Sequence, residues 1–293
     1  MISRKTVLAC FALLIMLSSG CARLDIAATQ RPGRELCRLM NREIMESSGL
    51  AFSQSGKDIL WTHNDSGDAP RIFAFDLDGR DLGAFEINGA DAVDWEDMAS
   101  FTMEGQGYLL IADVGDNYRQ REFVTLYLVR EPDVDRDHEN AGRVIGVEQR
   151  IDFTYEDGPR DCESVAVDPA TRTIFLVSKS KRKKCKVYSL LLDESSTGEI
   201  ASAGAVASIK VQYATAMDVS PDGRRAVVLT YLEAYEWTRQ ESETWSEAFG
   251  RTPYLLLMPP RPQGESICYS PDGQSLYLTS EAAPTPLWEV IVN

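Results

Sequence analysis

Short apolar runs separated by polar turns recur along most of this chain. Runs such as ILWTH, YLLIAD, TIFLVS and SLYLTS are rich in Val, Ile, Leu, Tyr and Phe, which is typical of β-strands. The tetrapeptide SPDG occurs at 220–223 and again at 270–273, where it predicts a tight turn between two strands. A convincing helical pattern is confined to QESETWSEAF at 240–249. The pattern therefore predicts an all-β protein.

One phrase, a polar residue followed by an apolar run, begins each group of strands. Glutamate takes the polar position in DWEDMASF, DCESVAVDP and GESICYSP, whereas serine or threonine takes it in ESSGLAFS and ATAMDVSPDG. We call these polar positions the slots; successive slots are 48, 67, 52 and 50 residues apart, and they are Ser48, Glu96, Glu163, Thr215 and Glu265. A period near 50 residues, with about four strands in each repeat, indicates a β-propeller.

The repeats predict one propeller domain of five four-stranded blades over residues 35–293. The last repeat has only three strands before the chain stops, so ELCRLMNREIM at 35–45 is expected to supply the fourth strand and close the ring. Six blades are the alternative, if the 67-residue interval contains a further partial blade. The surplus residues of that interval, EPDVDRDHENAG, are charged and favour a loop.

The first 20 residues have the pattern of a secretory signal peptide. MISRK is followed by the apolar run TVLACFALLIML, which is too short to span a bilayer, and then by SSGC. This ending resembles a bacterial lipoprotein signal, which predicts lipidation of Cys21 and a polar tether over 21–34. Ser18 stands where the usual motif has leucine, and an ordinary cleaved signal with an incidental cysteine is the alternative. We expect an exported protein, lipid-anchored on the periplasmic or cell-surface side of a bacterial membrane.

The chain is strongly acidic, and this excludes some partners. It has 30 basic and 45 acidic residues, a formal net charge of −15, and removal of residues 1–20 takes away two basic residues and no acidic one. Nucleic acid and anionic membrane surfaces repel such a chain. We therefore expect no nucleic-acid partner and membrane contact through the lipid anchor only. An envelope protein or a small anionic ligand is the expected partner.

Propeller geometry gathers the slots on one face. The start of each inner strand lies beside the end of the second strand, so the slots, with Asp94, Asp97 and Asp161 next to them, meet segments such as HNDSGD and DVGDN at one channel mouth. Carboxylates crowded there must be protonated, paired or bound to metal, and oxygen ligands suit Ca²⁺ or another hard divalent cation. The candidate metal ligands are Glu96, Glu163, Glu265, Asp65, Asp113, Asp116 and Asn117. The alternative is that the glutamates accept hydrogen bonds from neighbouring blades and only hold the ring together.

Three further side chains are candidates for contact with a bound ligand. His63 ends a second strand, Asp97 adjoins a slot, and Lys179 begins the basic run KSKRKKCK at 179–186. The basic run can clamp a phosphate or carboxylate beside a metal, or it can be a solvated loop that offsets nearby acids.

Four cysteines follow Cys21, and export permits disulfides between them. Cys162 and Cys185 are predicted at the same end of the third blade, so we expect them to form a disulfide. Cys37 and Cys268 are predicted on an outer and an inner strand of the last blade, too far apart to join.

The motifs also carry a family resemblance. SSGLA, THNDSGDAPRIFAFDLDG, WEDMA, IADVGDN, ESVAVDP, TAMDVSPDG, TYLEAYEW and GESICYSPDGQSLYLTSE resemble those of a group of uncharacterised, exported bacterial β-propeller proteins. That group is distantly similar to TolB-like, gluconolactonase-like and esterase-like-phytase propellers, which implies an acidic channel mouth. Gluconolactonase-like propellers coordinate a divalent metal there through Glu, Asn and Asp, and the corresponding positions in this chain are Glu96, Asn117 and Glu265. The characteristic motifs of the propeller phytases are not recognisable.

Two functions fit these observations. The favoured one is a lipid-anchored binding or scaffold protein of the cell envelope whose acidic mouth binds a divalent cation. The alternative is a metal-dependent hydrolase of a lactone or phosphoester, in which the ion would activate water and His63 or Lys179 would assist. Serine hydrolysis is disfavoured because GxSxG is absent and His63 is the only plausible triad base.

Overall fold

The computed structural model describes residues 33–136, 142–182, 184–192 and 198–292. The predicted signal peptide, Cys21 and most of the predicted tether lie outside these residues. No helix in the described ranges is long and apolar enough to cross a membrane.

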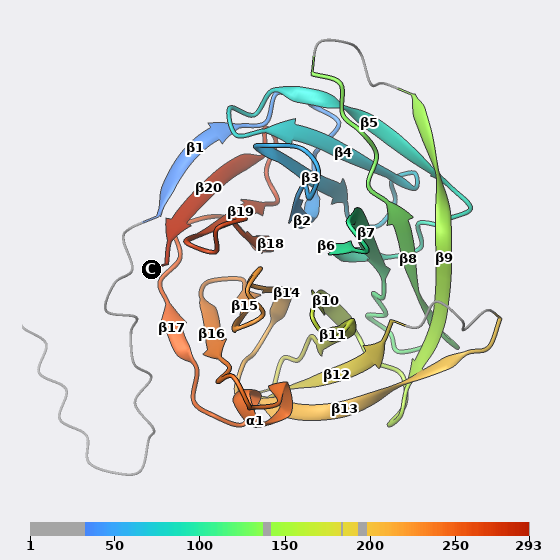
Figure 1. The fold of residues 1–293 in the computed structure, drawn as a ribbon, viewed down its shortest axis with the longest axis vertical. Coiled ribbons are helices and arrows are strands. Elements are labelled where there is room, and N and C mark those ends of the chain that lie inside the picture. Colours follow the sequence, from blue (N-terminus) through green and yellow to red (C-terminus); the bar gives the residue numbers. More distant parts are fainter. Residues whose placement is uncertain (1–32, 137–141, 183, 193–197, 293) are drawn as a thin grey trace, which may run out of the picture.

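Strand pairing divides the described strands into five antiparallel groups of four, arranged around a central axis (Figure 1). The predicted all-β propeller is therefore confirmed. The innermost strands line the axis and are buried on both faces, which explains their nearly continuous apolar runs. They are β2 (Ser47–Phe52), β6 (Trp95–Met103), β10 (Cys162–Asp168), β14 (Ala214–Val219) and β18 (Gly264–Tyr269).

Each innermost strand is followed outward by a second and a third strand of the same blade. The second strands are β3 (Ile59–Asn64), β7 (Gln106–Asp113), β11 (Thr173–Ser178), β15 (Arg225–Thr230) and β19 (Ser275–Ser280). The third strands are β4 (Arg71–Asp76), β8 (Val124–Arg130), β12 (Cys185–Leu191), β16 (Ala234–Thr238) and β20 (Pro286–Ile291). The outermost strands are β5 (Asp81–Asn88), β9 (Arg143–Tyr155), β13 (Ala201–Ile209), β17 (Tyr254–Leu256) and β1 (Arg34–Arg38).

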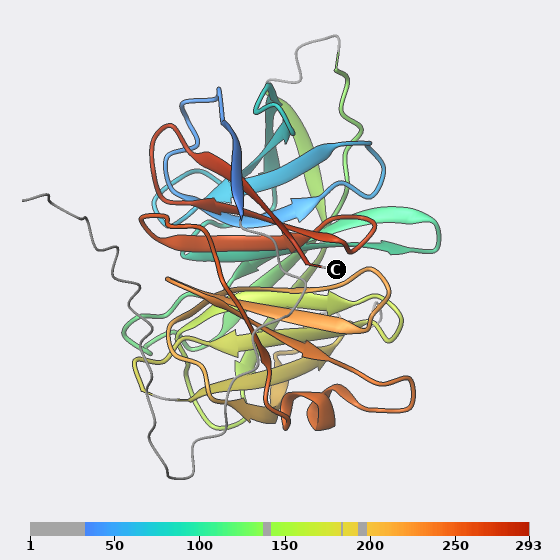
Figure 2. The same ribbon diagram turned by 90° about the vertical axis from the view of Figure 1, so that its left-hand side faces the viewer.

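The N-terminal strand closes the last blade, as predicted. Strand β1 pairs antiparallel with β20, with Arg34 opposite Glu289 and Arg38 opposite Pro286. Only the first part of the segment 35–45 is extended, so the closing strand is shorter than the sequence indicated. Figure 2 views the ring from the side. This pairing covers an edge that would otherwise be open to other chains.

A separate hydrophobic core lies at each junction between neighbouring blades, including the junction of the last and first blades. At the junction of the last and first blades, the rings of Phe52 and Tyr277 meet edge to face with centroids 4.9 Å apart. Between the third and fourth blades, the helix α1 (Trp245–Phe249) buries both of its terminal aromatic rings. This helix is shorter than the predicted segment 240–249 because Thr244 caps its N-terminus in a capping box with Glu247.

The long interval between the second and third slots is occupied by an extended outer strand. Strand β9 has 13 residues and pairs antiparallel with β8 of its own blade. It also pairs in parallel with β5 of the preceding blade and with β13 of the following blade. The outer edges of these three blades are thus joined into one continuous sheet.

The predicted disulfide between Cys162 and Cys185 is wrong, because both residues are free thiols. Their strands, β10 and β12, are separated by β11, and two strand spacings of about 4.8 Å exceed the reach of a disulfide. The two thiols are buried in different cores and contact different carbonyls, those of Val177 and Val211. Cys37 and Cys268 are also free thiols.

Candidate functional site

A β-bulge interrupts every innermost strand where a slot had been placed. The pairing with the second strand shifts around residue 96 in β6, 163–164 in β10, 215 in β14 and 265 in β18. In the first blade the unpaired residue is Gly49, one residue after the aligned Ser48. A bulge redirects the side chain of its unpaired residue away from the regular alternation. The repeated phrase of the sequence therefore encodes a repeated bulge.

Two carboxylate triads sit at this end of the channel. One oxygen from each of Asp65, Asp94 and Glu96 lies within 4.8 Å of the others, and the same holds for Glu96, Asp161 and Glu163. Glu96 belongs to both triads. Glu96 and Glu163 are only 7% and 3% exposed, so these carboxylates are largely withdrawn from water. We call Asp65, Asp94 and Glu96 the first triad, and Glu96, Asp161 and Glu163 the second triad.

Gly115 in the DVGDN motif makes room for the first triad. A Cβ at this position would overlap the carboxylates of both Asp94 and Glu96. Its amide also donates to the carbonyl of Asp94, at 3.1 Å, which holds the loop after β7 against the start of β6. The glycine thus permits the close approach of backbone and carboxylates.

The two hydroxyl slots have a different role. The Oγ of Ser48 donates to the carbonyl of Glu96 at 2.5 Å, and the Oγ1 of Thr215 donates to the carbonyl of Gly264 at 2.7 Å. Each bond joins a blade to the next blade around the ring. The hydroxyl slots therefore hold neighbouring blades together. The three glutamates, for which a structural role was the alternative, have their carboxylates at the channel mouth.

Lys179 is the cation of the second triad. Its ammonium group forms an ion pair with Glu163, and it lies 5.0 Å from the ring centroid of Tyr231. Burial lowers the pKa of Lys179, but the carboxylate of Glu163 more than offsets this and leaves that pKa raised. Lys179 is therefore protonated at neutral pH, and the predicted ligand-contacting lysine is already bound to a predicted metal ligand.

Glu265 lies at the same mouth but in neither triad. The side-chain amide of Gln263 donates to Glu265 and also, at 3.2 Å, to Glu281. Burial raises the pKa of Glu265 to about 7, and Glu281 and Asp65 add to the rise. We call the carboxylates of both triads and of Glu265 together the acidic mouth.

The acidic mouth holds its protons unusually tightly. Burial, followed by repulsion from Asp65 and other neighbouring carboxylates, raises the pKa of Asp94 to about 6. Burial and the charge of Glu163 raise the pKa of Glu96 well above its usual range. Burial raises the pKa of Asp161 and of Glu163 as well. Such a set of carboxylates gains stability from protons or from a cation, and a divalent cation is the stronger neutraliser.

Stability is expected to fall as the pH rises from about 4 to about 7 in the absence of divalent cations. The folded carboxyls of Asp94 and Glu265 keep protons there that the unfolded chain has released, so folding becomes less favourable. Together they cost on the order of 4 kcal/mol, after allowance for the partial exposure of Asp94. Thermal unfolding in EDTA at a series of pH values measures the effect.

The control for this prediction is the variant Glu265→Gln. Buried His63 has a lowered pKa and gives a slope of the opposite sign near pH 6.5, and the variant leaves that contribution in place. The wild type should therefore lose more stability than Glu265→Gln across this pH range. Equal slopes in the two proteins would contradict the assignment.

The remaining predicted metal ligands are not part of either triad. Asp113 is 1% exposed and forms an ion pair with Arg121 at 2.7 Å. Asp116 accepts the backbone N–H groups of Gln120 and Arg121 at 2.8 and 3.1 Å. Both carboxylates thus shape the loop after β7. Asn117 lies at the exposed surface of that loop, which does not support the ligand role that the resemblance implied.

His63 and Asp97 are too deeply buried to contact a ligand at the mouth. The His63 ring is fully buried against Trp95, edge to face, and its Nδ1 lies 2.9 Å from the carbonyl of Asn64. Asp97 accepts the backbone N–H groups of Met98, Val165 and Met217 at 2.8, 2.8 and 3.1 Å. Its carboxylate joins three blades, so the ligand-binding role predicted for Asp97 gives way to a structural one.

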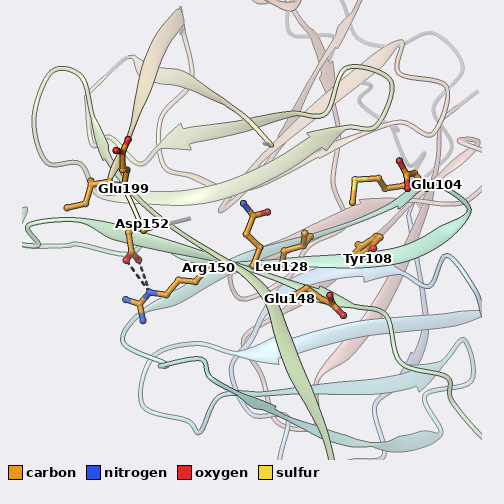
Figure 3. Close-up of a pocket in the computed structure, with 11 residues that line it drawn as sticks. Glu104, Tyr108, Leu128, Glu148, Arg150, Asp152 and Glu199 are labelled. Carbon is orange, nitrogen blue, oxygen red and sulfur yellow. Dashed lines mark hydrogen bonds and ion pairs between the residues drawn. The ribbon is translucent and has the colours of Figure 1, made fainter. Parts of the chain in front are cut away.

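Two cavities lie elsewhere on the ring. One, of about 520 Å³, lies at the outer edge of the second and third blades, where Arg150 is already paired with Asp152 at 2.9 Å (Figure 3). The other, of about 340 Å³, is lined by innermost strands and by the SPDG turns at Pro221 and Pro271. Neither contains a residue of the acidic mouth.

Sequence reasoning missed two tyrosines beside the mouth. Tyr213 and Tyr231 stack with ring centroids 5.6 Å apart, and Tyr231 contacts Lys179. Tyr231 lies in the segment after the second strand of its blade, which propeller geometry places at the mouth. Tyr213 directly precedes β14, yet an isolated tyrosine beside a strand gives no signal of its own.

No family model matches the chain, and no curated protein matches it. Among solved structures, a gluconolactonase from Xanthomonas campestris is similar at 12% identity and a TM-score of 0.49, over 94% of this chain and 99% of that one. A chain of a nidogen/laminin complex is similar at 14% identity and a TM-score of 0.48, over 80% and 72% of the two chains. A chain of a mitotic checkpoint complex is similar at 12% identity and a TM-score of 0.38, over 83% of this chain and 63% of that one. None of these similarities identifies an activity for this chain.

Proposed function

We propose that this protein is a divalent-cation-dependent binding propeller, with Ca²⁺ as the favoured ion. The observation that carries the proposal is the pair of triads that share Glu96, because in each triad three carboxylates lie within ligand distance of one another around a buried glutamate. The cation would complete the mouth and present a positive charge to an anionic ligand.

The donor set fits a hard cation. Every member of the triads offers carboxylate oxygen, and neither triad includes a histidine or a cysteine. Ca²⁺ and Mg²⁺ bind such ligands, whereas zinc sites use histidine or thiolate. Ca²⁺ tolerates irregular geometry and several carboxylates, so it suits a site built from three separate segments of the chain better than Mg²⁺ does.

The first triad is the better primary position. Glu163 of the second triad is paired with Lys179, so a cation there would have to compete with an ammonium group. Asp65, Asp94 and Glu96 form no ion pair within the described residues. Asp65, Asp94 and Glu96 would thus hold the ion, and Asp161 would reinforce its negative surroundings.

Replacement of Lys179 by glutamine is expected to tighten Ca²⁺ binding about tenfold. The substitution removes a competing positive charge next to Glu163 and frees that carboxylate for the cation. Calorimetric titration of the metal-free protein with Ca²⁺, together with analysis of metal bound after purification, measures this. Lys57→Gln removes an exposed lysine elsewhere and serves as the matched control.

A Ca²⁺ affinity that is unchanged in Lys179→Gln would contradict this prediction and would show that the second triad, which shares Glu96 with the first, does not act on the bound cation. A wild-type domain that contains no metal, and whose melting temperature responds to neither Ca²⁺ nor EDTA, would overturn the proposed function.

A metal-dependent hydrolase is the second candidate, and the Glu163–Lys179 pair favours it. A buried carboxyl with a raised pKa next to an ammonium group can hold or accept a proton beside a polarising cation. Generic lactone and phosphoester substrates with and without EDTA discriminate the two candidates. Chelator-sensitive turnover that is lost in Glu163→Ala supports the hydrolase, and its absence supports binding alone.

We further propose that this propeller acts in the bacterial cell envelope, held to the membrane by a lipid on Cys21. The apolar start of the sequence and the SSGC ending support this location. Labelling with a radioactive fatty acid in wild type and in Cys21→Ser would test it, since only the wild type should incorporate the lipid.

A further inference from the structure

A cavity of about 780 Å³ opens beside the acidic mouth, next to Lys179. Its lining includes the rings of Tyr213 and Tyr231, the side chain of Leu232 and the lysines Lys184 and Lys210. Leu232 is 75% exposed and adds apolar surface to this lining. Glu233 also lines the cavity, and its carboxylate accepts a hydrogen bond from the hydroxyl of Tyr235 at 3.1 Å. The cavity therefore combines an apolar, aromatic surface with two lysines and one carboxylate.

The tyrosines connect this cavity to the second triad through direct contacts. Glu163 pairs with Lys179, Lys179 lies 5.0 Å from the ring centroid of Tyr231, and Tyr231 stacks on Tyr213 at 5.6 Å and an interplanar angle of 26°. A molecule lying against these rings would have one end within reach of the acidic mouth.

Tyr213 is held in a strained backbone conformation. Its φ of +54° lies in the left-handed region, which a bulky residue rarely adopts and which costs about 1 kcal/mol or more. Its amide donates to the carbonyl of Ser180 at 3.0 Å, so the basic loop fixes this conformation. The ring is therefore placed against Tyr231 at a cost in stability, which is typical of functional positions.

The two lysines of the cavity have no ion-pair partner in the part of the chain that the structure describes. Within the described ranges, neither Lys184 nor Lys210 forms an ion pair, although the chain has 45 acidic residues and a net charge of −15. Neighbouring basic residues do find partners, since Lys179 pairs with Glu163 and Lys186 with Asp157. Unpaired cations beside aromatic rings are suited to an anionic ligand.

We propose that this cavity, the tyrosine shelf, binds small anionic molecules that carry a ring. The ring lies against Tyr213 and Tyr231, and the negative group contacts Lys184 and Lys210. Planar or puckered rings gain from stacking on tyrosine faces, and the lysines select for negative charge. The inference rests on the proposed function in one respect, because the shelf would hold the ligand of the acidic mouth.

Naphthalene-2-sulfonate is a suitable probe, since it carries a ring and a permanent negative charge and is a weak ligand for Ca²⁺. Calorimetric titration in EDTA compares it with 2-naphthol, which has the ring alone, and with inorganic sulfate, which has the charge alone. We expect the sulfonate to bind more tightly than either one.

Three variants locate the binding. Tyr213→Asn removes the ring but keeps a residue that tolerates the left-handed region, so the fold is retained and affinity falls about tenfold. Lys184→Gln combined with Lys210→Gln should weaken binding of the sulfonate about fivefold and leave 2-naphthol unchanged. Lys57→Gln is the control and should match the wild type.

If the shelf variants bind the sulfonate with the same affinity as Lys57→Gln, the inference is overturned. The proposed function would survive this result if the wild type binds Ca²⁺. The opposite result is that the shelf variants weaken sulfonate binding while the wild type does not bind Ca²⁺. That result would overturn the proposed function and leave the tyrosine shelf as a binding site.

Discussion

Glu96→Gln is expected to weaken Ca²⁺ binding about 100-fold, the largest effect on ligand affinity that the structure predicts. Glu96 is the only residue shared by the two triads of the described chain, so both lose a charged ligand at once. Glutamine has the same shape, and the backbone carbonyl that accepts the Ser48 hydroxyl is unchanged. Calorimetric titration of the metal-free proteins measures the loss.

The same variant should be at least as stable as the wild type in EDTA. Burial and Glu163 raise the pKa of Glu96 well above its usual range, so its charge is unfavourable in the empty mouth and glutamine removes it. Glu281→Gln is the matched control, because it removes a carboxylate that adjoins the acidic mouth through Gln263 and belongs to neither triad. Its Ca²⁺ affinity should stay within about threefold of wild type. Equal losses in the two variants would show a general effect of charge and not coordination.

Asp97→Ala is expected to cost about 4 kcal/mol of folding free energy or more. The carboxylate of Asp97 is fully buried and accepts backbone N–H groups from its own strand and from the two following blades. Alanine would leave these three donors buried without an acceptor, and each costs about 1–3 kcal/mol. Urea unfolding monitored by tryptophan fluorescence measures the change.

Asp97→Asn keeps the prediction testable if the alanine variant does not fold. One amide oxygen remains to accept a hydrogen bond, while the NH₂ group faces a backbone donor, so an intermediate loss of about 2 kcal/mol is expected. Asp91→Ala is the control, because Asp91 is an exposed aspartate in a weak pair with Arg150 at 3.4 Å. A loss below about 1 kcal/mol in Asp97→Ala would show that the carboxylate does not join the blades.

The prediction of a disulfide between Cys162 and Cys185 is wrong because the repeat pattern does not give distances between strands. Cys162 and Cys185 are at the same end of one blade, as the repeat indicated, but an entire strand separates them. The order of strands in the sequence shows which strands pair within a blade. It does not give the distance between side chains on strands that do not pair. Asn117 is similar: its motif leads to the mouth, but the residue itself is exposed.

The sequence by itself determined the fold class, the repeat, the closing strand and the end of the channel at which the glutamates gather. These follow from local strand propensity and from a period that recurs, so each repeat carries the information independently. Only the tertiary structure decided how residues of one type divide into different roles. Glu96 and Asp97 are adjacent acids, yet the bulge sends Glu96 to the mouth and leaves Asp97 to join three blades. Burial and distance to neighbouring charges, which depend on all the blades together, make that distinction.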